Sequence, residues 1–358
     1  MCIRDRVDPA TGRLYVDVQT DEHGIFIHRL HVLDVASGAE VPGSPVTVRA
    51  TAPGFPGVDF HPHTAFQRSG LALDRGIVYV PYASNDDARG WMIGFDAATL
   101  DVVRVFCVTP KGALGGIWEG GAAPAVDDGG DLYVSTGNGA FNAAVGGPNH
   151  GMSVLRLAAT NQLNVVDYFA PYNERPMSRR DGDLGSGGVM LLPDHPGPHR
   201  REAVTGGKEG RLFVLDRDAL GTFHRDGNHV VQQLDANLRN GYYSSPAYFG
   251  GAVYYAANSA HLDRYAIHLS LIHISQRVPP LLESGFAPML AYCFVFFCPL
   301  QSGIGALSGA AKLETFVPFR TWDPPHAASD TAMSAAVASR KESMMALYIR
   351  RRSVSHKF

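Results

Sequence analysis

The stretch VDDGGDLYVST, from Val126 to Thr136, joins an acidic, glycine-containing turn to a short strand that contains an aromatic residue. Alternating strands after such turns are typical of β-hairpins. The recurrence of this phrase predicts stacked β units rather than one mixed fold. Its other copies are DPATGRLYVDV (Asp8 to Val18), LDRGIVYVPY (Leu73 to Tyr82), TGGKEGRLFVL (Thr205 to Leu215) and YFGGAVYYAA (Tyr248 to Ala257).

A second phrase, consisting of a strand, a polar turn and another strand, follows the first. We therefore predict an all-β fold, a β-propeller of about five four-stranded antiparallel blades, because blades packed in a ring bury both faces and expose few edges. A β-sandwich is the alternative, but it does not require the same two-part phrase five times. The copies are HVLDVASGAEV (His31 to Val41), MIGFDAATLDVV (Met92 to Val103), VLRLAATNQLNVV (Val154 to Val166), FVLDRDALGTF (Phe213 to Phe223) and the short DRYAIH (Asp263 to His268).

The composition agrees with many short elements joined by turns. The 358 residues include 39 glycines and 23 prolines, and 45% of them are hydrophobic and 18% charged. These values exclude a disordered or collagen-like chain and disfavour a helical bundle. Two longer loops, roughly Phe141 to Gly151 and Tyr168 to Gly188, interrupt the third unit, and function in such folds usually lies on loops.

Two short segments, MCIRDR (1–6) and LSLIHIS (269–275), can be encoded by the two strands of one oligonucleotide. That oligonucleotide resembles the mosaic-end adapter of transposon-made sequencing libraries, so we exclude both segments from the fold. The predicted organisation is a partial propeller over 7–268, followed by an unrelated, poorly structured tail over 276–358. This hypothesis makes the chain a chimeric, incomplete reading frame.

Charge and hydropathy exclude two classes of partner. The segment Val7 to His268 is acidic, whereas nucleic-acid binding depends on basic side chains that displace counterions. The uncharged run from Ser284 to Ala311 is interrupted by prolines, glycines and serines, so we do not expect a membrane span there. Within 7–268, Cys107 is the single cysteine, and no internal disulfide is predicted.

At its repeats the chain resembles the pyrroloquinoline-quinone (PQQ) repeat propellers, the quinoprotein dehydrogenase-like superfamily. Two local matches concern the first half of the chain. RGWMIGFDAATL (89–100) is similar to the segment after the family's calcium-binding glutamate, and the candidate here is Asp86. IWEGGAAPAVDDGGDLYVSTGNG (117–139) is similar to the stretch that runs from the tryptophan beneath the quinone to a calcium-binding asparagine. The resemblance gives these roles to Trp118 and Asn138.

Two further matches follow in the family's order. DGDLGSGG (181–188) resembles the Asp-x-x-Asp region whose second acid is the catalytic base, which implies Asp183. GGKEGRLFVLDRDALG (206–221) resembles the family phrase that places a lysine at the quinone carbonyl, which implies Lys208. Asp183 and Lys208 are therefore the catalytic candidates, and Trp118, Asn138 and Lys208 are the cofactor-binding candidates.

The resemblance implies a PQQ- and calcium-dependent dehydrogenase that oxidises an alcohol or a sugar in the periplasm or outside the cell. Calcium prefers several oxygen ligands, here Asp86, Asn138 and Asp183, and as a Lewis acid it polarises the quinone carbonyl. Asp183 would accept the alcohol proton, Lys208 would stabilise the growing negative charge, and Trp118 would give the quinone a flat apolar floor.

Each of these residues also has a structural interpretation. Trp118 can be a packing aromatic, Asn138 a turn residue that bonds its own backbone, and Lys208 a solvated hairpin charge. The family's adjacent cysteine pair is absent from 7–268, and its proline-containing segment after the Gly-Asn is replaced by GAFN (139–142). Whether the chain is an enzyme therefore stays open. The alternative is a noncatalytic propeller that serves as an interaction platform for a protein or a polysaccharide.

Overall fold

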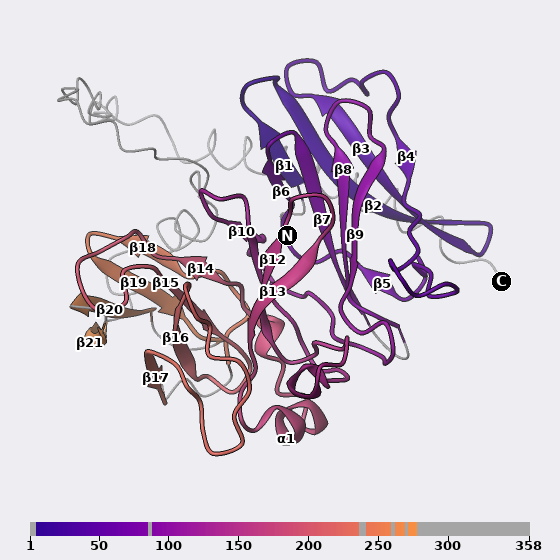
Figure 1. Cartoon of the computed structure of the whole chain (residues 1–358). Helices are drawn as coiled ribbons and strands as arrows, with labels where there is room; N and C mark the ends of the chain where they lie inside the picture. The colour runs from indigo at the N-terminus through magenta and orange to yellow at the C-terminus, as the bar shows by residue number, and fades with distance from the viewer. Residues whose placement is uncertain (1–4, 85–87, 236–240, 259–261, 269–270, 278–358) are drawn as a thin grey trace, which may run out of the picture. The chain divides into compact units, whose positions relative to one another are not determined.

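Five antiparallel sheets follow one another along the chain (Figure 1). This computed structural model describes residues 5–84, 88–235, 241–258, 262–268 and 271–277. Most of the predicted tail, from residue 278 onward, lies outside the described residues. In the described part, no helix is both long and apolar enough to cross a membrane.

The first two sheets contain the strands of the first two repeats. In the second sheet, β5 and β6 both pair with β7, so its first strand is split into two short pieces. The strands of the first sheet are β1 (Asp5–Asp8), β2 (Arg13–Glu22), β3 (Ile25–Asp34) and β4 (Val46–Thr47). Those of the second are β5 (Ala65–Phe66), β6 (Ala72–Asp74), β7 (Ile77–Ser84), β8 (Trp91–Asp96) and β9 (Val102–Cys107).

The other three sheets are four-stranded meanders in chain order. The third contains β10 (Ala125–Val126), β11 (Leu132–Ser135), β12 (Val154–Ala158) and β13 (Asn164–Phe169). The fourth contains β14 (Met190–Leu191), β15 (Glu202–Gly206), β16 (Leu212–Asp216) and β17 (Gln232–Leu234). The fifth contains β18 (Ala247–Phe249), β19 (Ala252–Ala256), β20 (Leu262–His268) and β21 (Leu271–Arg277).

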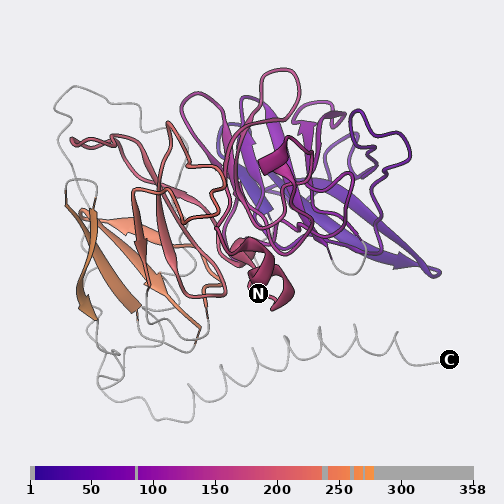
Figure 2. The same cartoon turned by 60° about the horizontal axis from the view of Figure 1, so that its bottom comes forward.

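The short first strands of consecutive sheets contact one another, β1 with β6, β6 with β10 and β10 with β14. Sheets that meet along their first strands and stack face to face are the blades of a β-propeller. The prediction of an all-β propeller with about five four-stranded antiparallel blades is therefore confirmed. Figure 1 labels the strands, and Figure 2 shows the same cartoon from another side.

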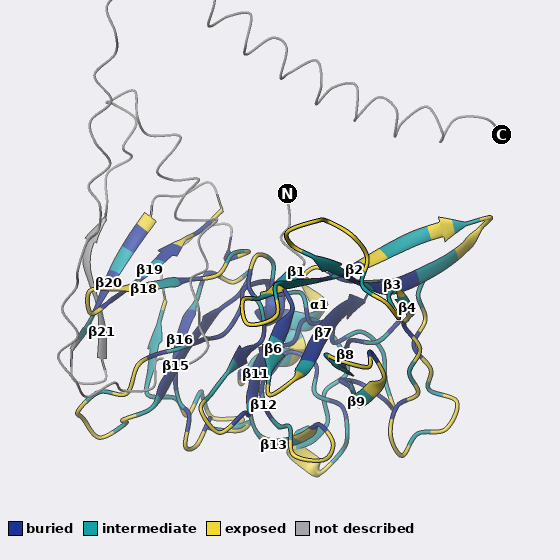
Figure 3. Ribbon diagram, turned by 90° about the horizontal axis from the view of Figure 1, so that it is seen from above, coloured by how far each residue is buried: buried dark blue, intermediate teal, exposed yellow. Residues whose placement is uncertain are grey.

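Each space between consecutive sheets holds its own apolar core. Strand β7 shows why, because its side chains alternate: Val78 and Val80 pack toward the first sheet, whereas Tyr79 packs toward the third. Four such cores lie between the five sheets, and Figure 3 shows β7, β15 and β16 largely in the colour of buried residues. Burial on both faces explains why the repeated strands are rich in valine, leucine and tyrosine.

In the part of the chain that the structure describes, helices occur only in the two loops predicted to interrupt the third unit. The first loop contains the 3₁₀ helix η1 (Ala143–Val145). The second contains α1 (Glu174–Arg179) and the 3₁₀ helix η2 (Leu184–Ser186). These loops connect β11 to β12 and β13 to β14, and they carry part of the candidate site.

The two segments attributed to an adapter lie partly in strands. Strand β1 includes Asp5 and Arg6, and β21 begins at Leu271 and pairs with β20. Ladder hydrogen bonds join backbone groups, so this pairing does not depend on the origin of the coding DNA. The adapter origin stays a prediction.

Candidate functional site

The antiparallel order of the strands gathers the four candidate loops at one end of the sheets. Connections alternate between the two ends of a meander, so the loop between the second and third strands lies at the same end as the connection to the next sheet. Asn138 and Lys208 follow the second strands β11 and β15. Trp118 and Asp183 lie on the connections from β9 to β10 and from β13 to β14.

Lys208 lies between two carboxylates. Its Nζ is 2.6 Å from Oδ2 of Asp183 and 2.7 Å from Oδ1 of Asp181. Its backbone N–H also donates to the Asp183 carbonyl at 3.0 Å. Asp183 is buried, with a side chain 6% exposed, whereas the Asp181 side chain is 74% exposed. Lys208 therefore neutralises a carboxylate that has little contact with water.

These contacts keep the Lys208 and Asp181 side chains charged. Burial lowers the pKa of the Lys208 ammonium, but hydrogen bonds to Asp181 and Asp183 outweigh it, and the pKa is raised overall. The hydrogen bond from Lys208 lowers the pKa of Asp181. Both effects follow the rule that a nearby opposite charge favours the ionised form.

Asn138 connects to the same acids. Its backbone N–H donates to Oδ1 of Asp183 at 2.6 Å, and its Nδ2 donates to Oδ1 of Asp181 at 2.7 Å. Its own Oδ1 is buried and has no hydrogen-bond partner among the described residues. The side-chain amide therefore bonds across the site to Asp181, and its oxygen remains available to a ligand.

The Trp118 indole and the Asp183 carboxylate both lie close to the backbone of Gly137. A Cβ atom added to Gly137 would lie 2.3 Å from Oδ1 of Asp183 and 2.9 Å from Cδ1 of the Trp118 indole. Glycine at this position allows the backbone, the indole edge and the carboxylate to approach closely. On the other side, the Phe66 ring is nearly parallel to the indole, at 15° and with centroids 6.5 Å apart.

The structure thus brings together Trp118, Asn138, Asp183 and Lys208 from four different connections. The remaining candidate, Asp86, lies outside the described residues. The roles given to all five remain predictions, since their proximity alone does not identify a ligand.

Two acids of this region were given no role from the sequence. Asp181 lies inside the DGDLGSGG match, and its contact with Lys208 depends on folding. Glu119 directly follows Trp118 and is completely buried. Its Oε1 accepts the Ser135 N–H at 2.9 Å, whereas Oε2 is buried without a partner among the described residues. A single charged residue in the apolar stretch GIWEGGAAPA is the sequence signal that could have pointed to it.

Burial dominates the ionisation of Glu119. It raises the pKa of this carboxyl from 4.5 to about 8, against the opposing hydrogen bonds from Ser135. A carboxyl in an apolar site keeps its proton because the charged form loses its hydration. Glu119 is therefore largely protonated at neutral pH, next to the tryptophan of the candidate site.

The residues present fit a planar quinone with a hard cation. Asn138 Oδ1 is a buried oxygen without a partner among the described residues, and carboxylates of Asp181 and Asp183 lie beside its amide. Such oxygens are the ligands that calcium prefers. The indole of Trp118 could support an aromatic ring, and the Lys208 ammonium could donate to a carbonyl.

The comparisons with known proteins concern the fold. No family model matches the chain, and no curated protein is similar to it in sequence. Quinohemoprotein alcohol dehydrogenase ADHIIG from Pseudomonas putida HK5 is 17% identical with a TM-score of 0.46, over 74% of this chain and 44% of that protein. BamB from Moraxella catarrhalis is 12% identical with a TM-score of 0.37, over 76% of this chain and 66% of that protein.

A third similar structure is an oxidoreductase (glucose dehydrogenase) from Thermus thermophilus. It is 14% identical with a TM-score of 0.40, over 77% of this chain and 84% of that protein. The chain spans less than half of the Pseudomonas enzyme and 66% of BamB. At these identities and TM-scores, the similarities do not assign a function to the chain.

Proposed function

We propose that the chain is part of a PQQ- and calcium-dependent dehydrogenase that oxidises an alcohol or a sugar, in the periplasm or outside the cell. The observation that carries this proposal is the cluster of Trp118, Asn138, Asp183 and Lys208. These four residues come from separate connections and combine a flat apolar ring, oxygen ligands, a buried carboxylate and a cation.

In this proposal Asp183 is the general base. Its Oδ1 is held by the Asn138 N–H and its Oδ2 by the Lys208 ammonium, so the carboxylate has one fixed orientation. It accepts the hydroxyl proton of the substrate while the carbon that bears the hydroxyl gives up a hydride, and the substrate leaves as a carbonyl compound. Bound PQQ would supply the hydride acceptor, and bound calcium would polarise its carbonyl.

The other residues position these groups. Lys208 stays protonated and can share its hydrogen bonds between Asp183 and a ligand carbonyl. Asn138 Oδ1 would ligate calcium together with Asp183, and Asp86 is the further proposed ligand. The indole of Trp118 would carry the quinone on its face.

The alternative is a noncatalytic propeller that binds a protein or a polysaccharide. One observation favours it: both Asp183 oxygens already have partners within the chain, so the ion cluster can simply hold three connections together. In that case Lys208 and Asp183 stabilise the fold and bind no cofactor.

Titration of the full chain with PQQ and calcium distinguishes the two functions. Quinone absorbance reports binding, and the melting temperature should rise with ligand concentration, since a ligand selective for the native state stabilises it. Asp183→Asn should abolish turnover of alcohols and sugars, while Asp218→Asn, which removes a carboxylate from the exposed pair with Arg201, should retain it. If neither absorbance nor melting temperature changes with PQQ, the noncatalytic platform is the better account.

A further inference from the structure

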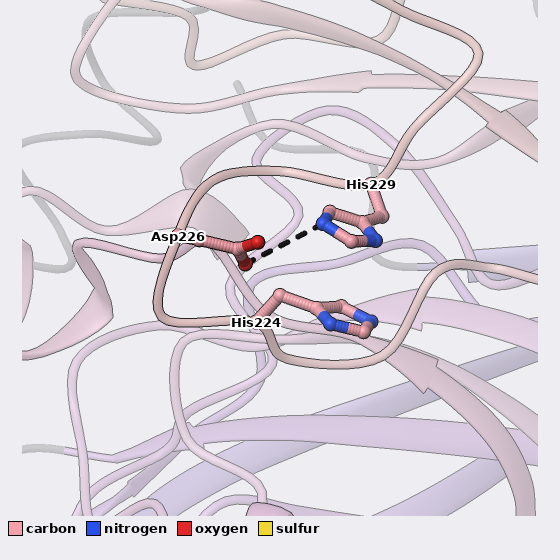
Figure 4. A group of neighbouring side chains, drawn as sticks. All are labelled: His224, Asp226 and His229. Carbon is pink, nitrogen blue, oxygen red and sulfur yellow. Dashed lines mark ion pairs between the residues drawn. The ribbon is translucent and has the colours of Figure 1, made fainter.

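The connection between β16 and β17 brings two imidazoles and a carboxylate within reach of one ion (Figure 4). One ligand atom from each of His224, Asp226 and His229 lies within 4.8 Å of the others. Nε2 of His229 is 3.5 Å from Oδ1 of Asp226, and the two imidazole rings stack with centroids 3.7 Å apart. The three side chains come from a stretch of six residues, HRDGNH.

The backbone of this loop is fixed by the neighbouring sheet. The Thr222 N–H donates to the Tyr168 carbonyl at 2.9 Å, and the Ala170 N–H donates to the Thr222 carbonyl at 3.1 Å. On the far side, Asn228 Oδ1 accepts the Tyr172 N–H at 2.8 Å. The loop is therefore anchored just before His224 and again between Asp226 and His229, and an ion would not have to order it.

Glycine makes the closure of the loop possible. Gly221 has a φ of +106°, and a Cβ atom there would lie 1.9 Å from the His229 carbonyl oxygen. The chain thus returns close to its start, which places His229 next to His224. Only glycine tolerates both this backbone conformation and this contact.

The ligand atoms have weak competing partners. The ring of His224 has one described hydrogen-bond partner, the Thr222 hydroxyl at 3.2 Å, and the ring of His229 has its ion pair with Asp226. The Asp226 side chain is 80% exposed and that of His229 is 51% exposed. By contrast, the ring of His28 is buried and bonded to Asp17 at 2.6 Å, so that histidine is committed to the fold.

The site borders a pocket that is wide open to solvent. A pocket of about 660 Å³ is lined by both histidines, and also by Arg156, Asp167 and Asp218. A metal held by three protein ligands with a free fourth position facing such a space is the arrangement of catalytic rather than structural zinc sites. Neither the three ligands nor the residues that line this pocket include Trp118, Asn138, Asp183 or Lys208, so this site has its own set of side chains.

We propose that His224, Asp226 and His229 bind one divalent transition-metal ion of the zinc type, with an open coordination position toward the cavity. Two imidazoles and one carboxylate suit zinc and its neighbours, whereas calcium prefers oxygen ligands alone. Coordination requires the stacked rings to tilt apart, because each nitrogen lone pair lies in its ring plane. The exposure of His229 leaves room for this rotation.

Calorimetric titration of the untagged, chelator-treated full chain with zinc chloride tests the site. We expect one equivalent of zinc to bind, and the His224→Ala/His229→Ala variant to lose at least tenfold in affinity. The matched control is His61→Ala/His63→Ala, which removes the two histidines of the HPH segment. Cobalt(II) substitution should add visible d–d bands of a four-coordinate site, and the double variant of the loop should lack them.

Three results decide the outcome. Equal zinc affinity in the loop variant and the wild type would overturn the proposal, and so would loss of binding in the HPH control. If the double variant fails to fold, Asp226→Asn decides, because this exposed side chain is not part of a core. A weakened affinity and a changed cobalt spectrum in Asp226→Asn support the site, and unchanged values reject it.

Discussion

The ammonium of Lys208 lies 2.6 Å from Oδ2 of Asp183, and this pair joins the second strand of the fourth sheet to the connection that enters that sheet. The same carboxylate accepts the Asn138 N–H from the third sheet. The contact therefore ties two neighbouring blades together at the end where the candidate site lies, whatever ligand that end binds.

Removing the ammonium should destabilise the protein. Lys208→Met keeps most of the side-chain volume but leaves the buried Asp183 carboxylate without its cation, and we expect a loss of about 2 kcal/mol in the free energy of unfolding. Asp183→Asn combined with Lys208→Met should cost clearly less than the sum of the single variants, because one interaction is removed twice. Urea unfolding of the four proteins measures this, and simple additivity would show that the pair is not coupled.

Because of the Glu119 carboxyl, the free energy of unfolding should fall as the pH rises toward alkaline values. The folded-state pKa of about 8 lies above the unfolded value of 4.5, so the folded state retains the proton more strongly. The contribution is complete below about pH 4.5 and is lost as pH rises toward and through 8, by at most about 1.4 kcal/mol per pH unit. Thermal unfolding from pH 5 to 9 should show this loss, and Glu119→Gln should flatten it.

The control for this experiment is Glu209→Gln, which neutralises a carboxyl on the loop after Lys208 that forms ion pairs with Arg180 and Arg211. The Glu209→Gln variant should still lose stability as the pH rises, as the wild type does. An identical pH profile in wild type and Glu119→Gln would mean that Glu119 is ionised in the folded protein at neutral pH.

Gly137→Ala should disturb the candidate site directly. The new methyl would lie 2.3 Å from the Asp183 carboxylate and 2.9 Å from the Trp118 ring, and overpacking of this kind costs about 1–3 kcal/mol. Tryptophan fluorescence and the melting temperature report the change. Gly129→Ala is the matched control, because its nearest neighbour, Oδ1 of Asp127, lies farther away at 3.1 Å. Equal effects of both variants would contradict the close approach at Gly137.

Truncating a large side chain in the core between the third and fourth sheets should strongly lower the free energy of unfolding. Phe213 is 1% exposed and packs against Phe169 with ring centroids 5.0 Å apart, so Phe213→Ala should cost about 3–5 kcal/mol. Phe249→Ala removes the same side chain at a position that is 71% exposed and should cost less than about 1 kcal/mol. Denaturant midpoints of the two variants test this, and similar shifts would contradict the assigned core.

Much of the fold could be predicted from the sequence because strands have a simple period. Alternating residues after Gly/Asp turns indicated the hairpins, and five copies of the phrase indicated five sheets. The split of the first strand into β5 and β6 could not be predicted, since both pieces are short and β5 pairs with the end of β7 across the whole β6–β7 hairpin.

The candidate site was predictable only where a family motif covered it. Asp181 lay in such a motif but gained its role through the distance to Lys208, which the sequence does not contain. Glu119 depends on complete burial, and the spacing of His224, Asp226 and His229 has meaning only once Gly221 closes the loop. Desolvation and loop closure are tertiary effects, so a single sequence carries little signal for them.

Each space between consecutive sheets has its own apolar core. This arrangement also determines how the protein unfolds. Each described sheet is stabilised by its immediate neighbours. The unfolding of one sheet is therefore coupled mainly to that of the adjacent sheets, as in a one-dimensional array. Among the described residues, the third sheet shares two interfaces, whereas the fifth shares one. Amide hydrogen exchange should therefore be slowest in β11 and β12 and should quicken toward β19, giving a graded rather than an all-or-none loss of protection.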